Sequence, residues 1–542
     1  MEPISFRQHI LNGIRPDSMP GRNAPFMAQM TNIRCDRFGG RPFDAITQPW
    51  SDAYLNGLNT KLWPHPQYFQ FKTHGILAFA DEVYEVNYNA GTATLLNIKD
   101  FSDLATPFGI TGTAPWHAID LYGTWMLFNG TTTLMRIGVS GQVYGTNDVT
   151  IKTGCEYRET RAFWGGFDAS NCFALADWQT YLAGYDNNAG TDTQDAVADL
   201  AGSLGRNSVW WSSWYGADLL WLFSLTYMKY KNLAGTETAG YSESDPFWRH
   251  LKRMGQSGSR VMPWQGDIAK VLELGDGVAV YGSTSSDALP GGCAGLTPID
   301  GGIANTFGLR RLAGWPTGLG VFSRSAVGGD PYGHVAISEE GELWRIEPDF
   351  TATRTERAGY KEIFSEYIDR DDNIVISLDP ARRDFYIADG QECHVLTPNG
   401  LCQAPWRPTT VYFHNGERVG VYTDYSDPNT VTMVSQVHTI SGDGVARVVE
   451  RLKHIGKNNA SNPVQFALDY RVNEQVEFTR TSFVTADADG EAAFMIPCIE
   501  FRWVLKCASK SAVTVDDVQA IIGNGTARLS GWPASSTSPA TE

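Results

Sequence analysis

The feature that most constrains the fold of this chain is a hairpin pattern that recurs along much of its length. Short runs in which every second residue is apolar are separated by clusters of Gly, Asp, Glu and Asn. Alternation of this kind is typical of β-strands, whose side chains point in turn to the two faces of a sheet, and the clusters favour tight turns. The pattern occurs at residues 76–86, 116–137, 268–282, 334–348 and 373–398.

The repetition predicts an all-β protein with a β-propeller-like body. Hairpins at intervals of roughly 40 to 60 residues are typical of propellers, in which each blade is a four-stranded sheet. Two packed sheets would leave similar hairpins, so a β-sandwich is the alternative for the same segments. The composition agrees with either fold, because 19% of the residues are charged, against about 25% on average, and the chain holds 55 Gly and 26 Pro. We expect helix in less than roughly 15% of the residues.

Changes in this pattern divide the chain into segments. The N-terminal part shows no sustained periodicity and predicts an extended arm that lies against a neighbouring subunit. Alternating strands return near the C-terminus and predict a β-sandwich, followed by a Ser-, Pro- and Ala-rich flexible tail. The expected organisation is an arm at 1–63, a propeller-like domain in two parts at 64–162 and 266–430, a Trp-rich insertion at 163–265, a sandwich at 431–529 and a tail at 530–542.

The insertion interrupts the hairpins with a high density of tryptophan. Two short helices are expected in it, at residues 193–204 and 245–254, with Asp245 before Pro246 as the N-cap of the second. So many indoles in one segment fit either a partner interface or a domain core. The tryptophans are Trp164, Trp178, Trp210, Trp211, Trp214, Trp221, Trp248 and Trp264.

The charge of the chain argues against a protein that grips nucleic acid. It has 43 Lys plus Arg against 60 Asp plus Glu, a formal net charge of −17, whereas phosphate-binding surfaces are basic. The most apolar run, residues 217–227, is about half the roughly 20 residues of a membrane-spanning helix. Residues 1–13 lack the apolar core of a secretory signal. We therefore expect no membrane-spanning segment and no export.

Four short motifs could carry chemistry, and each has a simpler structural interpretation. Residues 291–295 match the Gly-x-nucleophile-x-Gly elbow of hydrolases with Cys293 as the nucleophile, but the flanking sequence favours a Gly-rich loop. Residues 338–344 resemble the Asp-box turn of sialidase-type propellers, which is structural in that family. Residues 369–373 and 487–491 cluster carboxylates without the register of a calcium-binding loop, so solvated turns are preferred.

The 10 histidines and 8 cysteines are scattered and lack the spacing of zinc ligands. Reduced, mostly buried thiols are the preferred interpretation of the cysteines. We therefore predict a non-enzymatic protein with no catalytic residue, no cofactor and no metal site.

Four segments resemble proteins of bacteriophage tails. Residues 13–16, Gly-Ile-Arg-Pro, and residues 32–42 resemble the opening of tail hub and nozzle proteins of short-tailed phages, in which an extended arm precedes the first blade. Residues 207–213, Asn-Ser-Val-Trp-Trp-Ser-Ser, resemble a stretch common in phage virion proteins. Residues 501–522 are similar to the closing strands of the packaged-DNA stabilisation hub. None of these segments is a chemical motif, and the Trp-rich insertion departs from the family pattern.

The resemblance implies a structural virion protein without catalytic residues. Such a protein extends the DNA channel below the portal and adaptor, and helps to retain and then deliver the genome. The implied partners are other copies of the chain in a closed ring, most simply a hexamer, the portal adaptor, and tail fibre, spike or needle proteins. Double-stranded DNA would pass without tight binding along an acidic wall, to which turns such as 339–340 or 371–372 contribute. The expected location is the virion tail, after synthesis in the host cytoplasm.

Two other functions fit the same pattern. A carbohydrate-binding or carbohydrate-cleaving β-propeller would use the tryptophans to stack on sugars. A propeller scaffold of a cellular complex would use the body as a rigid platform.

Overall fold

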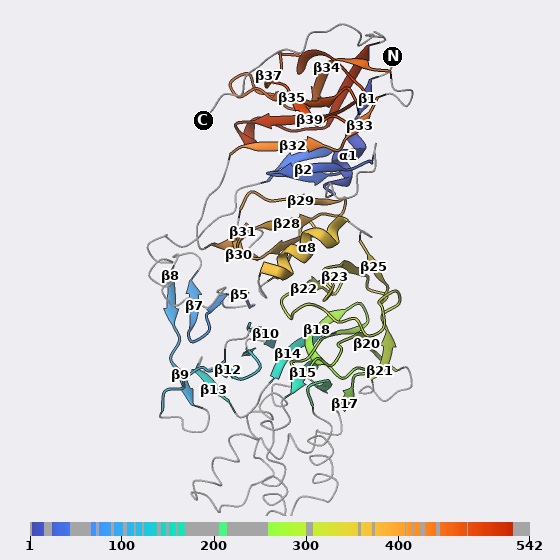
Figure 1. Ribbon diagram of the computed structural model, residues 1–542. Coiled ribbons are helices and arrows are strands. Elements are labelled where there is room, and N and C mark those ends of the chain that lie inside the picture. Colours follow the sequence, from blue (N-terminus) through green and yellow to red (C-terminus); the bar gives the residue numbers. More distant parts are fainter. Residues whose placement is uncertain are drawn as a thin grey trace, which may run out of the picture.

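The structure, a computed structural model, is built almost entirely from β-strands, which confirms the all-β expectation (Figure 1). Its described helices are α1 (Arg7–Asn12), α8 (Gly359–Arg370) and a 3-10 turn at Lys510–Ala512. Among the described residues no helix is long and apolar enough to cross a membrane. The structure describes residues 3–15, 24–43, 67–71, 75–87, 92–100, 106–112, 115–121, 124–137, 142–147, 151–158, 161–167, 205–213, 258–299, 307–355, 359–370, 374–406, 408–414, 417–422, 429–440, 445–473 and 475–523.

The body is β-propeller-like and consists of four-stranded antiparallel units, which we call blades, in sequence order. Within each blade, consecutive strands are antiparallel neighbours in the sheet, so the strand order follows the sequence. Blade one consists of β5 (Gln67–Gln70), β6 (Gly75–Ala78), β7 (Val83–Asn87) and β8 (Thr92–Leu95). Blade two consists of β10 (His117–Leu121), β11 (Thr124–Phe128), β12 (Thr133–Ile137) and β13 (Gln142–Thr146), with β9 (Ile98–Asp100) parallel to β13. Blade three consists of β14 (Ile151–Tyr157), β15 (Arg161–Phe167), β16 (Ser208–Ser213) and β17 (Gly258–Val261). Blade four consists of β18 (Asp267–Leu274), β19 (Gly277–Ser283), β20 (Cys293–Pro298) and β21 (Phe307–Arg311). Blade five consists of β22 (Val327–Asp330), β23 (Gly333–Ile337), β24 (Leu343–Ile346) and β25 (Ala352–Arg354). Blade six consists of β26 (Val375–Asp379), β27 (Asp384–Ala388), β28 (Cys393–Leu396) and β29 (Leu401–Gln403).

The first strands of the blades lie around a common centre. β10, β14, β18, β22 and β26 contact one another in succession, and a hairpin of β30 (Pro408–His414) and β31 (Glu417–Tyr422) continues from β26 to β5. Trp116 links β5 to β10, because its backbone N–H donates to the Gln67 side chain and its indole donates to the Phe79 carbonyl at 2.7 Å. The inner strands therefore surround the middle of the body.

The hairpins expected from the sequence are present as strand pairs of the blades. Three of their turns contain glycines with positive φ, namely Gly275 (56°), Gly341 (77°) and Gly390 (83°). Residues with a Cβ are disfavoured in this region, so these glycines fix where the chain reverses.

The Trp-rich segment differs from the expected insertion, because part of it is blade three. β15, β16 and β17 lie largely within residues 163–265 and pair with β14 or with one another. Trp211 is buried, with its ring centroid 5.8 Å from that of Phe163 and 5.3 Å from that of Phe307. Trp164 and Trp264 are also buried. Trp178, Trp214, Trp221, Trp248 and the helices expected at 193–204 and 245–254 lie outside the described residues.

The C-terminal part forms the expected β-sandwich of two sheets. Its core includes Leu452, Phe466, Trp503 and Val518, all fully buried, because alternate residues of each strand face the space between the sheets. One sheet has the order β1 (Ile4–Ser5), β40 (Asp517–Gly523), β34 (Arg447–Ile455) and β38 (Glu491–Cys498), and the other contains β2 (Met27–Thr31), β32 (Val431–Ser435), β39 (Glu500–Cys507), β35 (Gln465–Arg471) and β36 (Thr479–Arg480).

The described parts of the N-terminal arm lie on the sandwich of their own chain. Strand β1 pairs with β40, and the hairpin of β3 (Ile33–Asp36) and β4 (Gly39–Pro42) adjoins it through Gly40 and Val515. Phe6, Ile10 and Met30 are buried in the same core cluster as the sandwich residues. We expected this arm to contact a neighbouring subunit, but Phe6, Ile10 and Met30 are covered within the chain, whereas Phe38 is 52% exposed. Residues 44–63 lie outside the described part.

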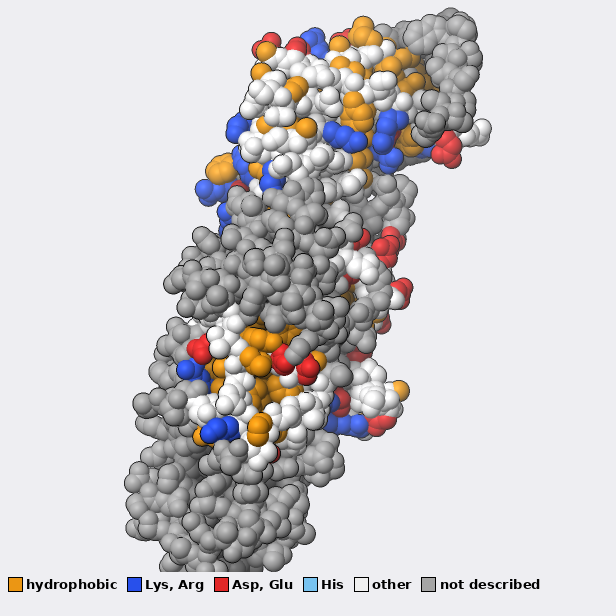
Figure 2. Space-filling view, turned by 90° about the vertical axis from the view of Figure 1, so that its left-hand side faces the viewer, with side chains coloured by type: hydrophobic (Ala, Val, Ile, Leu, Met, Phe, Trp, Pro, Cys, Tyr) orange, Lys and Arg blue, Asp and Glu red, His pale blue; other side chains and the backbone are white. Residues whose placement is uncertain are grey.

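Strand β2 joins the body to the sandwich in one continuous sheet. It pairs in parallel with β29 of blade six at Thr31 and Gln403, and antiparallel with β32 of the sandwich. Views at right angles show the sandwich and the body stacked end to end (Figures 1 and 2). The close approach at this joint requires glycine, because Gly13 has φ 75° and a Cβ there would lie 2.3 Å from the Leu401 carbonyl oxygen.

Candidate functional site

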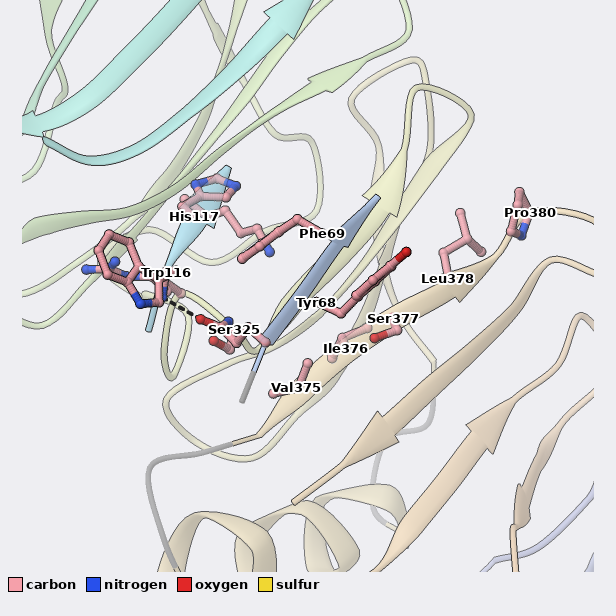
Figure 3. A pocket seen from close by; sticks show the side chains of 13 residues that line it. Tyr68, Phe69, Trp116, His117, Ser325, Val375, Ile376, Ser377, Leu378 and Pro380 are labelled. Atoms are coloured by element: carbon pink, nitrogen blue, oxygen red, sulfur yellow. Dashed lines mark hydrogen bonds between the residues drawn. The ribbon is translucent and has the colours of Figure 1, made fainter. Parts of the chain in front are cut away.

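A cavity of about 370 Å³ lies where the inner strands of several blades meet (Figure 3). Strands β5, β10, β18 and β26, together with the segment that leads into β22, supply its walls. Its size is within the range of small-molecule sites. The lining residues are Gln67, Tyr68, Phe69, Trp116, His117, Lys270, Arg324, Ser325, Val375, Ile376, Ser377, Leu378 and Pro380.

Lys270 reaches the cavity because strand β18 is irregular. A β-bulge between Ile268 and Lys270 shifts the pairing with β19, and bulges of this kind redirect side chains. The Lys270 ammonium donates to the Val327 carbonyl at 2.5 Å and keeps two further donors. Burial, together with the nearby Arg324 guanidinium, lowers the pKa of Lys270 to about 8.

Arg324 is the second cation of the cavity and comes from the segment before β22. Its guanidinium donates to the backbone carbonyls of Pro115 and Asn129, which flank the strands of blade two. Burial lowers the pKa of Arg324 to about 10. In the described part of the chain neither Arg324 nor Lys270 forms an ion pair with a carboxylate, and the lining contains no Asp or Glu.

His117, the first residue of β10, adds a neutral hydrogen-bond donor. The Gly154 N–H donates to its Nδ1 at 3.3 Å, and the Thr153 hydroxyl lies 2.6 Å from the same atom. The Thr153 oxygen already accepts from the Val271 N–H, so its own hydrogen is directed to Nδ1. The proton of the neutral imidazole is therefore on Nε2. Burial and the positive charges of Lys270 and Arg324 hold the pKa of His117 well below its usual value.

The rest of the lining is largely apolar. Figure 3 shows Trp116 near one end and Val375, Ile376 and Leu378 of β26 along a wall, with Tyr68 beside them. Cations and a histidine beside apolar surface can hold a small molecule that has an anionic group and an apolar part.

The hydrolase-elbow motif is a loop that enters a strand. Gly291 and Gly292 precede β20, which begins at Cys293, so the motif opens a strand and not a helix. Burial raises the pKa of the Cys293 thiol well above its usual value, so the nucleophilic thiolate is disfavoured. A Cβ on Gly292 would lie 2.9 Å from the Trp264 ring, which explains the small residue there.

The Asp-box-like motif is the turn between β23 and β24. Ser338 is buried and its hydroxyl accepts from the Glu342 N–H at 3.1 Å. The Glu339 carboxylate accepts from the backbone N–H groups of Thr284 and Gly320, and Glu340 forms a surface ion pair with Lys361 at 3.0 Å. These carboxylates hold neighbouring loops together.

The carboxylate clusters considered for calcium are also turns where they are described. Asp487 accepts from the N–H groups of Asp489 at 3.0 Å and Glu491 at 2.8 Å, which closes the turn before β38. Glu491 forms ion pairs with Arg451 and Lys453. Residues 371–373 of the other cluster lie outside the described part. Within that part no group of three or more His, Cys, Asp or Glu is arranged to hold a metal, and its seven cysteines are free thiols.

The cavity residues were not predicted from the sequence. Lys270 stands between Ala269 and Val271, Arg324 is flanked by serines, and His117 opens an ordinary alternating strand. The lysine between two apolar residues is a signal that could have been followed, because lysine is rarely buried. The convergence of the three groups depends on how separate blades pack.

Comparison with known proteins assigns no family to the chain. No protein-family model matches it, and no curated protein matches it. Among solved structures, apo AztD from Citrobacter koseri is 10% identical with a TM-score of 0.30, over 82% of this chain and 90% of that chain. PorZ from Porphyromonas gingivalis is 7% identical with a TM-score of 0.32, over 79% and 47%. The extracellular domain of BT4673 from B. thetaiotaomicron is 10% identical with a TM-score of 0.28, over 92% and 63%.

Proposed function

We propose that this chain is a structural subunit of the tail of a short-tailed bacteriophage, a hub or nozzle protein. In this role it extends the DNA channel below the portal and adaptor proteins, and helps to retain and then release the genome. Its place is the tail of the virion.

The observation that supports this role best is that three of the four segments resembling tail proteins lie close together in space, while residues 207–213 lie in blade three. Residues 32–42 and 501–522 lie near opposite ends of the chain, yet Gly40 and Val515 exchange backbone hydrogen bonds of 2.7 and 2.9 Å. Arg41 adds an ion pair with Asp516 at 2.5 Å. Segments that resemble tail proteins and also pack against one another support a tail-protein architecture better than segments that lie far apart.

A third segment that resembles tail proteins lies where the body meets the sandwich. Residues 13–16 begin at Gly13, which approaches Leu401 of blade six, and the Ile14 N–H donates to the Leu401 carbonyl at 2.7 Å. The joint fuses the body and the sandwich through β2, so the subunit is suited to transmit force along its length. A conduit that holds pressurised DNA needs such a rigid subunit.

We also propose that the role is non-catalytic, as the interpretation of each motif supports. Cys293, Glu339, Glu342 and Asp487 have backbone or core partners that account for their positions. The carbohydrate-binding alternative loses part of its basis, because the described Trp164, Trp211 and Trp264 are buried and not free to stack on sugars.

The test is assembly with the portal and adaptor proteins encoded in the same genome. The chain is co-expressed with them, and the complexes are analysed by light scattering and negative-stain imaging. We expect a closed ring of this chain, most simply six subunits, on the adaptor end. The matched control omits the adaptor and should show no ring on the portal. A folded chain that never joins the portal–adaptor complex would contradict the proposal.

A further inference from the structure

The central cavity contains two cations that no carboxylate of the described residues neutralises. Lys270 and Arg324 come from blade four and from the segment before blade five, and each donates to backbone carbonyls. Like charges that share a partly buried space repel each other, and burial removes part of their hydration. Two apolar residues in these positions would avoid both costs, so the arrangement calls for a ligand that supplies negative charge.

The donors that remain free are of the kind that recognises an oxyanion. The ammonium has two unused N–H groups, the guanidinium can present further N–H groups in a fixed fork, and His117 presents Nε2–H. All three residues line the same cavity, together with the hydroxyl-bearing Ser325 and Ser377. Charge-assisted hydrogen bonds to a carboxylate or phosphate are stronger than neutral ones.

The shape and lining of the cavity restrict what carries the anionic group. A volume of about 370 Å³ accommodates a small molecule and excludes a nucleic-acid duplex. Trp116, Ile376 and Leu378 contribute apolar side chains to the same lining. An inorganic ion would leave this surface in contact with water, whereas an aromatic or aliphatic body would cover it.

We propose that the cavity binds a small organic acid, with its carboxylate or phosphate group held by Lys270, Arg324 and His117 and its apolar part against Trp116 and Ile376. This binding does not depend on the tail role proposed above. The ligand bridges blades two, four, five and six, so its binding also stabilises the packing of the body.

Isothermal titration calorimetry of the full chain with four probes tests the proposal. The probes are benzoate, phenyl phosphate, inorganic phosphate and the neutral benzyl alcohol, so the two kinds of anionic group and the apolar part are examined separately. We expect benzoate or phenyl phosphate to bind more tightly than inorganic phosphate, and benzyl alcohol to bind least. No binding of either aromatic anion up to about 10 mM would overturn the proposal.

Variants locate the binding site. Lys270→Met should weaken binding of the aromatic anions at least about tenfold, because it removes one charged donor while the chain keeps a side chain of similar length. The matched control is Lys361→Met, which removes an exposed lysine on α8 and should leave binding unchanged. Equal affinities of wild type and Lys270→Met, or equal losses in both variants, would overturn the proposal.

A measurement on the unaltered chain covers the case in which Lys270→Met fails to fold. The photoreactive acid 4-benzoylbenzoate is irradiated with the wild-type protein, and the labelled peptides are identified by mass spectrometry. We expect labelling within residues 375–380 or at Trp116, suppressed by excess benzoate. Labelling confined to other parts of the surface would overturn the proposal.

Discussion

Single buried side chains make the stability of this protein depend on pH. His334 is 1% exposed; its Nε2 donates to the Glu273 carbonyl at 2.9 Å, and the Tyr281 hydroxyl donates to its Nδ1 at 2.8 Å. Burial lowers the pKa of His334 from 6.5 to about 4. His9, His117, His438 and His454 also have lowered pKa values, chiefly through burial. The fold therefore favours neutral histidines.

We predict that His334 contributes to acid destabilisation. Between pH 6.5 and 4 the unfolded chain binds a proton at this residue and the folded chain does not, so the free energy of unfolding falls as the pH falls. The full effect is about 3 kcal/mol. Urea unfolding of wild type and His334→Gln at pH 7, 5.5 and 4 measures it, and the difference between the two proteins should change by this amount. A difference that is constant with pH would contradict the prediction.

Lys270 should change the free energy of unfolding in the alkaline range. Its pKa is about 8 in the folded chain and 10.5 when unfolded, so between these values the unfolded chain binds more protons and stability rises with pH. Relative to Lys270→Met, the wild type should gain about 2 kcal/mol from pH 8 to 10.5, which allows for the water that reaches this side chain. Chemical unfolding at both pH values tests this, and a constant difference would count against a buried ammonium.

At the scale of elements, the N-terminal segment is held by packing and by one buried ion pair. Phe6 is 1% exposed and lies edge-to-face against Trp503 and Phe501, at 5.7 and 6.3 Å between ring centroids. Arg34 on β3 binds Asp384 of blade six through two N–H donors. The first contact ties the segment to the sandwich, and the second ties it to the body.

We predict that Phe6→Ala lowers the free energy of unfolding by about 3 to 5 kcal/mol and makes the N-terminal segment sensitive to protease. The physical reason is the cavity left beside the rings of Trp503 and Phe501. The control is Arg7→Ala, an exposed neighbour whose replacement should stay within about 0.5 kcal/mol. Limited proteolysis with N-terminal sequencing follows the segment. Protection equal to the wild type in Phe6→Ala would show that the segment is held elsewhere.

A second prediction at this scale concerns Arg34 and Asp384, whose side chains are 12% and 0% exposed. Asp384→Asn should cost about 3 to 5 kcal/mol, because it leaves the Arg34 charge with only the partly exposed Asp36 as its partner. Glu340→Gln, which breaks the exposed pair with Lys361, should cost less than about 1 kcal/mol. The double variant Arg34→Met with Asp384→Leu should cost less than Asp384→Asn alone. Denaturant midpoints decide among these outcomes.

At the scale of the whole molecule, the body and the sandwich share one core. A single cluster of buried residues includes Ile10 of α1, Tyr386 of blade six, Tyr367 of α8 and Trp503 of the sandwich. Together with the continuous sheet through β2, this core makes the two parts one mechanical unit (Figure 1). Deleting residues 1–43 should therefore expose part of this core, and not only remove a contact with a neighbouring subunit.

The charge of the whole chain gives the last prediction. With a formal net charge of −17, the protein should show no measurable binding to duplex DNA near physiological salt. In the proposed tail role DNA slides through the channel, and cationic contacts repeated around a ring would act as a brake. Fluorescence anisotropy with a labelled duplex at two salt concentrations tests this. Micromolar binding that weakens steeply with salt would indicate a DNA-gripping role instead.

The sequence by itself determined the elements whose pattern is local, namely the hairpins of the body and the strands of the C-terminal sandwich. Alternating apolar residues and glycine-containing turns give each hairpin locally, since a strand's two faces and a turn's backbone conformation depend on neighbouring residues. The hairpins at 268–282 and 334–348 therefore appear as expected, and so does the C-terminal sandwich.

Only the tertiary structure decided what depends on contacts between distant residues. The N-terminal segment has few apolar residues in periodic order, yet Phe6 and Met30 are buried, because they fill spaces left by strands near the other end of the chain. The strands of blade three were not recognised as one sheet because long connections separate them in the sequence. The cavity of His117, Lys270 and Arg324 was hidden because one bulge in β18 and the packing of separate blades bring these groups together, and no local pattern encodes such a convergence.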